Sequence, residues 1–414
     1  MRWNFWTAIA LAGIILAAGA APASAIGYKV IYTFQGSTDG AFPSGTLINV
    51  GGVLYGVAES GGAWGYGSVF ALNPKTGAVA PLYSFKGQAS NDGDIPMNSL
   101  INVRGRLYGT TRYGGTGGCA YGCGSVYSID PATGTETVLH SFQGGSDGDT
   151  PVSGLINLGD LLYGTTYYGG GSGNCDTGCG TIYTVDPASG AVTVVYAFAG
   201  WGDGASPFAT LLKAGGTLYG TTFYGGGLGG PSCNGLGCGT VFSLNSKTDT
   251  EAVLYAFRGR GDGADPYAGL VDVAGTMYGA TSYNGSGCKR GICGTIFSLD
   301  PVTGTKMTVY AFKGGSGDGA EPLSGVIDGG GLLYGTTFYG FNAACKPSGC
   351  GTIFSLDPAT GTESVVHAFQ AGSDGANPLG GLLKLGSRLI GTTSNGGNHE
   401  HCKQGCGTVY EISP

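Results

Sequence analysis

The chain has 414 residues, of which 86 are Gly and only 11% are charged, against roughly 25% in an ordinary soluble domain. The glycines follow no G-X-Y period, which excludes collagen, and 42% hydrophobic residues with a formal net charge of -7 are typical of a folded chain. The 19 Lys and Arg residues do not provide the basic face that nucleic acid or an anionic membrane surface requires.

The N-terminus predicts export. Arg2 is the one charged residue ahead of an apolar run at 5–21, and the small residues Ala-Ser-Ala follow at 23–25. This arrangement is typical of a secretory signal peptide cleaved after Ala25, although the run is also just long enough for an uncleaved membrane anchor. No other apolar run approaches that length. We therefore expect a secreted or periplasmic protein from residue 26, with no membrane span after cleavage.

The rest of the chain consists of copies of one long repeat. The tripeptide Leu-Tyr-Gly, or a close variant, recurs at spacings of 53 to 59 residues, with its central residue at Tyr55, Tyr108, Tyr163, Tyr219, Tyr278, Tyr334 and Ile390. A period of this length is too long for one coil of a β-helix and matches one blade of a β-propeller. No segment shows a sustained helical period.

The third copy shows the expected unit most completely. Short strands at 155–157 and 162–166 flank a Gly-Asp turn, and a variable loop leads to an alternating strand at 180–186. The turn Pro-Ala-Ser-Gly at 187–190 joins this strand to a fourth at 194–198, because Pro presets φ and Gly accepts a positive φ. Each copy therefore predicts one blade of four short antiparallel strands.

The two ends of the chain predict how the ring closes. Residues 29–34 repeat the fourth strand alone, whereas residues 407–412 repeat the third strand. Pairing of the first strand with the last completes the seventh blade and removes an open edge. We predict an all-β fold: a seven-bladed β-propeller, with four antiparallel strands per blade, forming a single domain over 26–414 that we expect to be a monomer.

Each copy carries Asp-Gly-x-x-Pro ahead of its first strand, with the acid at Asp39, Asp92, Asp147, Asp203, Asp262, Asp318 and Asp374. An Asp followed by Gly favours a turn in which the carboxylate accepts backbone N–H groups and Gly is left-handed. Calcium binding is an alternative, but one carboxylate per turn falls short of 6–8 ligands. Small residues follow each Pro by two and three places, as crowding around the axis requires, and they offer no acid or base for catalysis.

Six pairs of cysteines lie in the loops between the second and third strands: Cys119/Cys123, Cys175/Cys179, Cys233/Cys238, Cys288/Cys293, Cys345/Cys350 and Cys402/Cys406. In an exported chain, an even number in local pairs predicts disulfides. Each loop supplies two ligands without a third, which disfavours zinc, and the Cys-x-x-Cys spacing of redox sites is absent. We expect no metal or cofactor, and interpret the pairs as staples within long loops.

Aromatic residues on the same loops are the candidate ligand contacts. Trp64, in the loop without cysteines, and Trp201, beside Asp203, break the seven-fold pattern, although either could instead cover a neighbouring blade. Five blades also place Tyr just before the glycines that close the second strand: Tyr113, Tyr168, Tyr224, Tyr283 and Tyr339. These rings suit stacking on sugars, but their recurrence also favours packing between blades.

Two acids are the candidates for catalysis. The residue before the Pro of the motif varies among blades, and it is Asp265 and Glu321 in two adjacent copies. Two carboxylates facing each other near the channel would be the minimum for general acid and base work on a glycoside, whereas solvated loop acids are the alternative. His399 and His401 around Glu400 form a candidate metal or proton-transfer cluster, for which an exposed loop is again the alternative.

The repeat unit resembles a known family. Its form here is Gly-Thr-Ile-Phe-Ser-Leu-Asp-Pro-Ala-Thr-Gly at 351–361, Val-Val-His-Ala-Phe at 365–369, Asp-Gly-Ala-Asn-Pro at 374–378 and Gly-Leu-Leu at 381–383. It is similar to the Gloeo-Verruco, or GloVer, tandem repeat, over residues 28–414. The resemblance implies a bacterial surface or secreted protein with no established activity, and departs from the anchored members because the chain ends at Pro414 after a strand. The blades also look like kelch blades, which is an analogy of fold alone.

Two classes of function remain. The first is an exported, non-catalytic binding or surface-scaffold propeller, whose ligand would be a glycan or another surface polymer. The second is an exported enzyme acting on polysaccharide as a hydrolase or lyase, with Asp265 and Glu321 as its acids.

Overall fold

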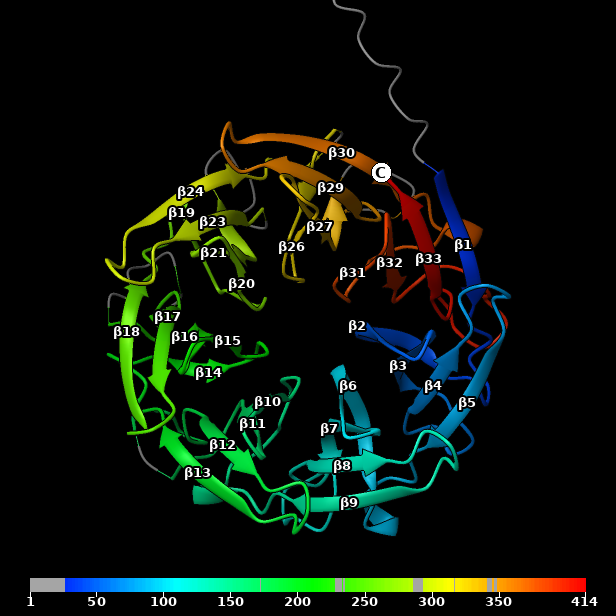
Figure 1. Ribbon diagram of the computed structural model, residues 1–414, viewed down its shortest axis with the longest axis horizontal. Coiled ribbons are helices and arrows are strands. Elements are labelled where there is room, and N and C mark those ends of the chain that lie inside the picture. The colour runs from blue at the N-terminus through cyan, green and yellow to red at the C-terminus, as the bar shows by residue number, and fades with distance from the viewer. Residues whose placement is uncertain are drawn as a thin grey trace, which may run out of the picture.

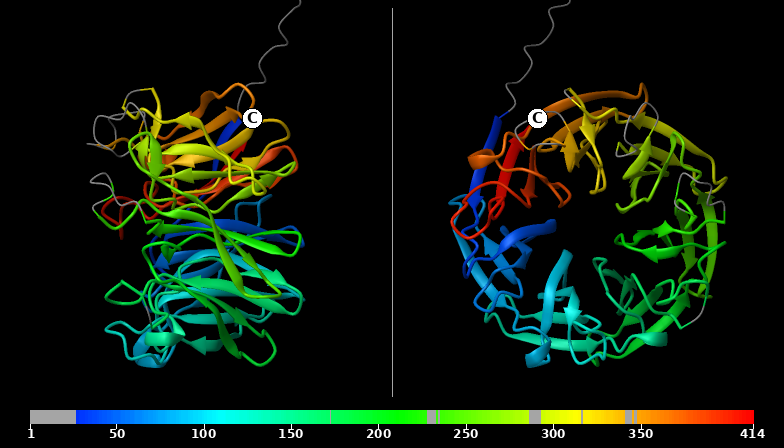
Figure 2. Two further views of the ribbon diagram at one scale, coloured as in Figure 1. Left: turned by 90° about the vertical axis from the view of Figure 1, so that its left-hand side faces the viewer. Right: turned by 180° about the vertical axis from the view of Figure 1, so that it is seen from behind.

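The computed structural model describes residues 27–171, 173–227, 233, 235–285, 293–315, 317–340, 345 and 348–414. The predicted signal peptide and its cleavage site lie outside these residues. Seven small antiparallel sheets stand around a central axis as the blades of a β-propeller (Figure 1), and the side and rear views show them as one closed ring (Figure 2). The prediction of a seven-bladed all-β propeller is confirmed.

The strands of each blade follow the chain from the axis outward. Blade 1 contains β2 (Ala41–Val50), β3 (Val53–Ser60), β4 (Ser68–Leu72) and β5 (Val79–Ser84). Blade 2 contains β6 (Gly93–Val103), β7 (Arg106–Gly114), β8 (Ser125–Ile129) and β9 (Glu136–Ser141). Blade 3 contains β10 (Ile156–Leu158), β11 (Leu161–Thr166), β12 (Thr181–Val185) and β13 (Val192–Ala197). Short 3-10 turns precede blades 2, 3 and 7: η1 (Gln88–Ser90), η2 (Gly145–Asp147) and η4 (Gly372–Asp374).

In blades 4 to 6 the innermost strand is interrupted and forms two short pieces. Blade 4 contains β14 (Ala205–Pro207), β15 (Leu212–Ala214), β16 (Thr217–Tyr224), β17 (Thr240–Asn245) and β18 (Thr250–Ala256). Blade 5 contains β19 (Asp262–Ala264), β20 (Val271–Val273), β21 (Thr276–Thr281), β22 (Tyr283–Gly285), β23 (Thr295–Leu299) and β24 (Lys306–Ala311). Blade 6 contains β25 (Gly319–Ala320), β26 (Ile327–Asp328), β27 (Leu333–Thr337), β28 (Tyr339–Gly340), β29 (Thr352–Asp357) and β30 (Thr362–Ala368).

The seventh blade joins the two ends of the chain. It contains β31 (Leu383–Leu385), β32 (Arg388–Thr393) and β33 (Thr408–Ser413), and its outermost strand is β1 (Gly27–Thr33). β1 runs antiparallel to β33 from Gly27 opposite Ser413 to Thr33 opposite Thr408, and the two strands lie side by side in Figure 1. The predicted closure by the first strand is therefore confirmed, and the last blade has no open outer edge.

One aromatic contact repeats between all neighbouring blades. A fully buried Phe at the end of each fourth strand meets the third-strand ring of the next blade edge to face, with centroids 5.0 to 5.3 Å apart. Such pairs contribute about 0.5–1.5 kcal/mol beyond the burial of their area. The pairs are Phe34–Phe70, Phe85–Tyr127, Phe142–Tyr183, Phe198–Phe242, Phe257–Phe297, Phe312–Phe354 and Phe369–Tyr410.

The glycine of each Leu-Tyr-Gly copy makes room for that third-strand ring. A Cβ added to Gly220 would collide with the Phe242 ring, and one added to Gly164 would lie 2.5 Å from the Tyr183 hydroxyl. Glycine weakens a strand interior, so its presence at these positions has a packing cause.

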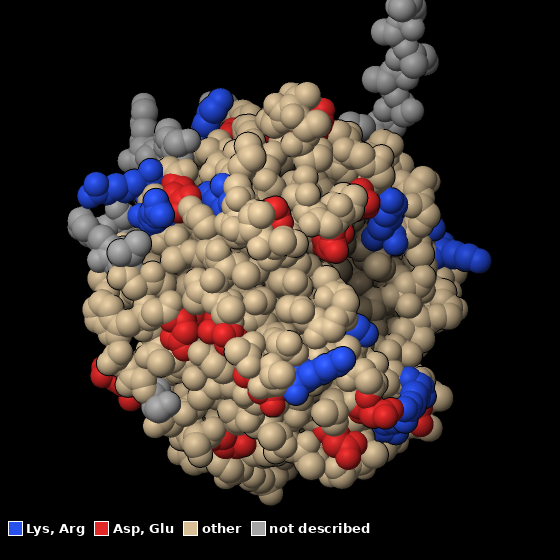
Figure 3. Space-filling model, turned by 60° about the vertical axis from the view of Figure 1, so that its left-hand side comes forward, with Lys and Arg blue, Asp and Glu red and all other residues tan. Residues whose placement is uncertain are grey.

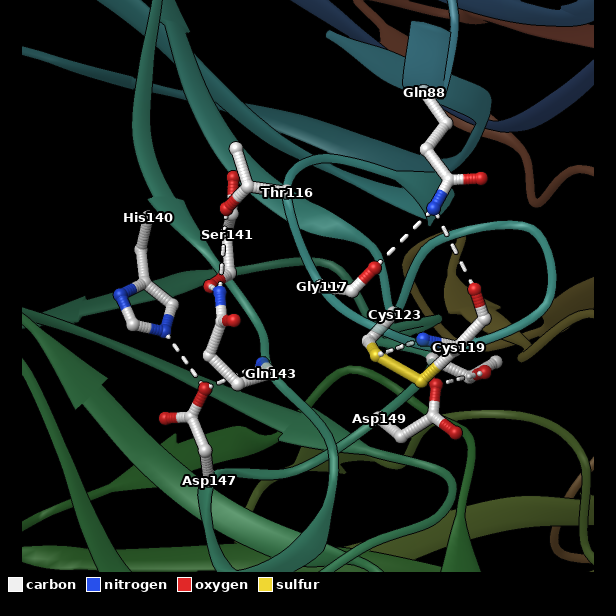
Figure 4. The surroundings of a disulfide bond; sticks show 11 residues. Gln88, Thr116, Gly117, Cys119, Cys123, His140, Ser141, Gln143, Asp147 and Asp149 are labelled. Atoms are coloured by element: carbon white, nitrogen blue, oxygen red, sulfur yellow. Dashed lines mark hydrogen bonds and ion pairs between the residues drawn. A yellow bond between two sulfur atoms is a disulfide. The ribbon is translucent and has the colours of Figure 1, made fainter. Parts of the chain in front are cut away.

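The acids of the Asp-Gly turns have the predicted structural role, whereas the following Gly has the expected positive φ in five turns and not at Gly93 or Gly319. Asp203 accepts hydrogen bonds from the hydroxyl of Tyr196 and from the backbone N–H groups of Ala199 and Gly200. His140 takes the place of that Tyr beside Asp147, with 3.2 Å between Nε2 and Oδ2 (Figure 4). All seven acids have such a partner on the preceding fourth strand: Tyr32, Tyr83, His140, Tyr196, Tyr255, Tyr310 and His367.

Five of the predicted cysteine pairs are disulfides within their own loops: Cys119–Cys123, Cys175–Cys179, Cys233–Cys238, Cys345–Cys350 and Cys402–Cys406. Cys293 is also disulfide-bonded, and its predicted partner Cys288 lies outside the described residues. Figure 4 shows the first bridge, where the side-chain amide of Gln88 donates to the carbonyl of Gly117. The predicted staples are confirmed wherever the structure describes both cysteines.

Candidate functional site at the mouth of the channel

The disulfide loops and the Asp-Gly-x-x-Pro turns meet on one face of the ring, which we term the loop face. In six of the seven turns, the backbone N–H of the residue before the Pro donates to a carbonyl in the disulfide loop of the preceding blade, or in the corresponding loop of blade 1, at 2.7 to 3.1 Å. The loop of one blade thus positions this residue of the next. The donor and acceptor residues are Phe42 and Cys406, Ile95 and Tyr66, Thr150 and Cys123, Ser206 and Cys179, Asp265 and Cys238, and Asn377 and Cys350.

These six residues and Glu321, the residue before the Pro in blade 6, share a left-handed backbone. Their φ angles lie between 54° and 60°, in a region that Asn and Asp tolerate better than other side chains. Since the residues after the Pro line the central channel in six of the seven blades, this ring lies at the end of the channel on the loop face. We term it the mouth; its members are Phe42, Ile95, Thr150, Ser206, Asp265, Glu321 and Asn377.

The two predicted acids lie at this mouth among tyrosines. The Tyr283 hydroxyl donates to Glu321 Oε1 at 2.8 Å, and Glu321 is only 8% exposed. Burial raises the pKa of Asp265 to about 7. Burial likewise raises the pKa of Glu321, and the hydrogen bond from Tyr283 acts in the opposite direction. Neither acid is a freely solvated loop residue.

The tyrosines of three adjacent blades alternate with these acids. Burial and then the charge of Asp265 raise the pKa of Tyr224, and burial and then Glu321 raise the pKa of Tyr339. Tyr283 is close to both acids. Burial and its hydrogen bond to Glu321 raise the pKa of Tyr283, and the charges of Glu321 and Asp265 raise it further. The sequence Tyr224, Asp265, Tyr283, Glu321, Tyr339 therefore forms an arc across blades 4 to 6, which we term the acidic arc.

A second polar group at the mouth comes from blades 1, 2 and 5, and the sequence analysis missed it. Burial raises the pKa of Glu59 to about 6, opposed by the Ser44 hydroxyl and the Arg112 guanidinium. The pKa of Tyr267 is raised by burial and then by the charge of Glu59, and Glu321 adds a smaller effect. Tyr267 thus connects this group with the acidic arc. Glu59 Oε1 and Arg112 Nε are sealed from solvent without a hydrogen-bond partner among the described residues.

Aromatic rings form the wall beside these charges. Tyr267 packs on Phe208 with 3.9 Å between ring centroids, and Tyr167 and Phe223 contact this pair edge on. These rings come from three consecutive blades. One side of the mouth is therefore aromatic.

The channel beyond Tyr267 is narrow and bears no charge. A cavity of about 290 Å³ is lined by small and apolar residues, Met97, Phe208 and Tyr267 among them. The Thr210 hydroxyl lies 3.3 Å from Asn98 Oδ1 and joins blade 4 to blade 2. In the oblique view of Figure 3, a hollow opens on the face that Figure 1 presents, and charged side chains are scattered in small groups over an otherwise uncharged surface.

Exposed aromatic residues follow the loop face across blades 1 to 4. Trp64 is 62% exposed and Trp201 is 60% exposed, so neither covers a neighbouring blade. The large aromatic side chains that are exposed among the described residues all belong to this face, and we term them the aromatic rim: Trp64, Tyr66, Tyr121, Tyr168 and Trp201. Tyr113 lies inside the rim, beneath the Arg112 guanidinium at 5.0 Å and beside Tyr121.

The other predicted clusters hold no site. His399, Glu400 and His401 are exposed on their loop, as the alternative interpretation expected. In the described part of the chain, one group of three His, Cys, Asp or Glu residues lies within metal-binding distance: Cys119, Cys123 and Asp149. Its two sulfur atoms are joined in a disulfide (Figure 4), so neither cysteine is a thiolate ligand.

A sequence signal for the missed residues did exist. The position before the strand-end Tyr holds unlike residues in the seven copies: Glu59, Arg112, Tyr167, Phe223, Ser282, Phe338 and Ser394. Such variation within a regular repeat marks positions that the fold does not dictate. The residue before the Pro varies among the copies in the same way.

The fold and the mouth define a disulfide-bonded β-propeller built from seven copies of one repeat. A family model for the Gloeobacter/Verrucomicrobia repeat matches residues 19–177 and 172–345. The chain belongs to this family, and the resemblance drawn from its sequence is confirmed.

Solved structures share the fold at low sequence identity. An oligogalacturonate lyase in complex with manganese has a TM-score of 0.51 and 14% identity, over 90% of this chain and 89% of that one. An oligogalacturonate lyase from Vibrio parahaemolyticus gives 0.50 and 10%, over 94% and 96%. A putative 6-phosphogluconolactonase from Bacteroides uniformis gives 0.51 and 16%, over 83% and 89%. At these identities the likeness concerns the fold alone.

No curated protein sequence matches the chain. In the part of the chain that the structure describes, no helix has the length and apolar character needed to cross a membrane.

Proposed function

We propose that the protein is an exported, non-catalytic binding propeller that holds a glycan on its loop face. The observation that carries the proposal is the aromatic rim, five exposed Trp and Tyr side chains on a face where five of the loops carry disulfides. Tyr and Trp present a flat apolar surface with a polar edge, which suits sugar rings and their hydroxyl groups. Exposed aromatic groups on a rigid frame are also typical of interaction surfaces.

Export is part of the proposal. Disulfides persist in oxidising compartments and are rare in the cytosol, and five bridges are formed in loops that lie at the surface. Together with the apolar N-terminal run and its small-residue site, they support a secreted or periplasmic location.

A glycan array probed with the protein from residue 26 tests the proposal. We expect the wild type to bind a group of related glycans, and the Trp64→Ala/Trp201→Ala variant to lose at least tenfold in affinity. Val302→Ala is the matched control, because Val302 is 91% exposed on the hairpin between β23 and β24, at the opposite end of its blade. Absence of binding to any glycan, or equal loss in the control, would contradict the proposal.

A second function is favoured by one specific observation, the pair of buried acids at the mouth. A carboxyl group with a pKa near 7 can act as a general acid at neutral pH, and Glu321, whose carboxylate accepts a hydrogen bond from the Tyr283 hydroxyl, would be the base. We therefore propose hydrolysis or lysis of a polysaccharide as the alternative, with Asp265 and Glu321 in these roles. Release of reducing ends from a polysaccharide panel tests it, and turnover that persists unchanged in Asp265→Asn would remove this pair from consideration.

A further inference from the structure

Neither acid of the acidic arc takes part in the ion pairs found among the described residues. Burial raises the pKa of Asp265, and among the described residues no hydrogen bond and no positive charge acts against that effect. Glu321 has the Tyr283 hydroxyl as its partner, which is neutral. Arg112 is the positive charge that acts on this part of the mouth, and its lowering effect on a carboxyl pKa falls on Glu59 rather than on the arc. Two carboxyl groups of adjacent blades, one partly and one almost fully buried, thus have no positively charged side chain paired with them among the described residues.

Buried polar atoms without partners lie around the same space. The Ser282 side chain is fully buried, its hydroxyl has no hydrogen-bond partner among the described residues, and its backbone N–H donates to the Asp265 carbonyl. Residues equivalent to Ser282, such as Phe223, contact the rings that line the mouth. Glu59 Oε1 and Arg112 Nε are in the same condition. Unsatisfied buried donors and acceptors cost about 1–3 kcal/mol each, so several of them around one space indicate groups that a ligand would satisfy.

We infer that the mouth takes an amino sugar unit of the bound glycan, with its ammonium group in the acidic arc and its hydroxyl groups against Arg112, Glu59 and Ser282. This inference rests on the proposed glycan-binding function and names the class of sugar. Carboxylates alternating with tyrosine rings recognise an ammonium group through ion pairs and through the negative faces of the rings. The Tyr267 and Phe208 rings provide a flat wall for the carbon skeleton of the sugar.

Other ligand classes fit this set of residues less well. An acidic sugar would be repelled by the carboxyl groups of Asp265 and Glu321, because Arg112 acts on Glu59 rather than on the arc. A divalent metal ion needs several oxygen ligands converging on one point, and no three acids at the mouth lie within metal-binding distance among the described residues. A neutral sugar would leave the two acids of the arc without a charged partner.

The test compares three tetrasaccharides by isothermal titration calorimetry at pH 7: one of glucosamine, its N-acetylated form, and one of glucose. We expect the glucosamine tetramer to bind at least tenfold more tightly than the other two. We expect that preference to vanish in Asp265→Asn/Glu321→Gln and to persist in Asp272→Asn. The Asp265 substitution is compatible with folding, because Asn377 occupies the equivalent left-handed position in blade 7.

Asp272→Asn is a matched control for the change of charge. Asp272 lies in the same blade, at the hairpin between β20 and β21, where its carboxylate accepts from the Gly275 N–H at 2.8 Å. Asn49 makes the same hydrogen bond to Gly52 in blade 1 at 3.0 Å, so Asn serves this turn. The control therefore removes one carboxylate without removing a turn.

The outcomes separate the two proposals. Equal affinity for all three tetramers, lost in Trp64→Ala/Trp201→Ala, would overturn the amino sugar while the glycan-binding function stands. A preference for glucosamine that survives the Trp substitutions and is lost in Asp265→Asn/Glu321→Gln would support the site at the mouth and contradict the role of the rim. If neither the array nor any tetramer shows binding, both proposals fail.

Discussion

Stability should fall as the pH rises from 5 to 8, and Glu251 offers the clearest test. It lies at the start of β18, where the Tyr196 hydroxyl donates to Asp203 at 2.9 Å and approaches Glu251 Oε2 at 3.3 Å. Burial and then the charge of Asp203 raise the pKa of Glu251 from 4.5 to about 7. The folded state therefore binds more protons than the unfolded state between these values, and the free energy of unfolding decreases as the pH rises through them.

The magnitude follows from the size of the shift. One pKa unit corresponds to about 1.4 kcal/mol, so the full shift would correspond to about 3 kcal/mol. Glu251 is partly exposed, and screening by solvent reduces this to about 1 kcal/mol. We expect Glu251→Gln to match the wild type at pH 5 and to exceed its free energy of unfolding by about 1 kcal/mol at pH 8, measured by urea unfolding with tryptophan fluorescence.

Blade 5 supplies an internal comparison. Lys306 pairs with Leu299 in the same register in which Glu251 pairs with Leu244, and its ammonium group lies 2.8 Å from Asp262 Oδ1. We expect Glu251→Lys to gain at least as much as Glu251→Gln at pH 8, because it recreates this ion pair with Asp203. Glu400→Gln, at an exposed loop residue, should leave the pH profile unchanged. A Glu251→Gln profile parallel to that of the wild type from pH 5 to 8 would refute the reasoning.

Two further predictions concern the repeat itself. Gly220→Ala should lower the free energy of unfolding by about 1–3 kcal/mol, because the added Cβ would overpack against the Phe242 ring. Gly216→Ala is the control: an added Cβ there meets nothing within 4 Å, so the midpoint of urea unfolding should change little. Equal effects of the two substitutions would contradict the packing explanation. Replacing Cys175 and Cys179 with Ser should cost about 2 kcal/mol, the loop-closure value for so short a loop, and a loss of more than twice that value would mean that the bridge also holds neighbouring structure.

The architecture was predictable because it depends on what the seven copies share. The number of repeat copies in the sequence indicated the number of blades. The copy of the fourth strand at the N-terminus indicated that β1 pairs with β33. The pairing of cysteines was also predictable, since partners four or five residues apart in one loop leave little choice. Each of these conclusions needs only local sequence and one rule of closure.

The polar group at the mouth was not predictable in the same way. Glu59, Arg112 and Tyr267 come from blades 1, 2 and 5, and Tyr267 responds to the charges of the other two because its ring lies where the blades converge. The sequence indicates which blades are neighbours but not how far a side chain extends from its own blade. The left-handed backbone of the residue before each Pro was equally hidden, since residues as unlike as Phe42 and Asp265 share it.

The disulfides also affect the candidate site, because they hold the loops that support the left-handed backbone of the mouth residues. A left-handed φ is costly for residues such as Ile95 and Thr150, and it persists because the N–H of each is held by a carbonyl in the preceding blade. For Thr150 of blade 3, that carbonyl belongs to Cys123 of blade 2, whose sulfur is bonded to Cys119 within a loop of five residues. Asp265 is held in the same way by Cys238. A bridge in one blade therefore fixes the position of a mouth residue in the next, so a rigid loop can carry variable side chains without altering the ring beneath them.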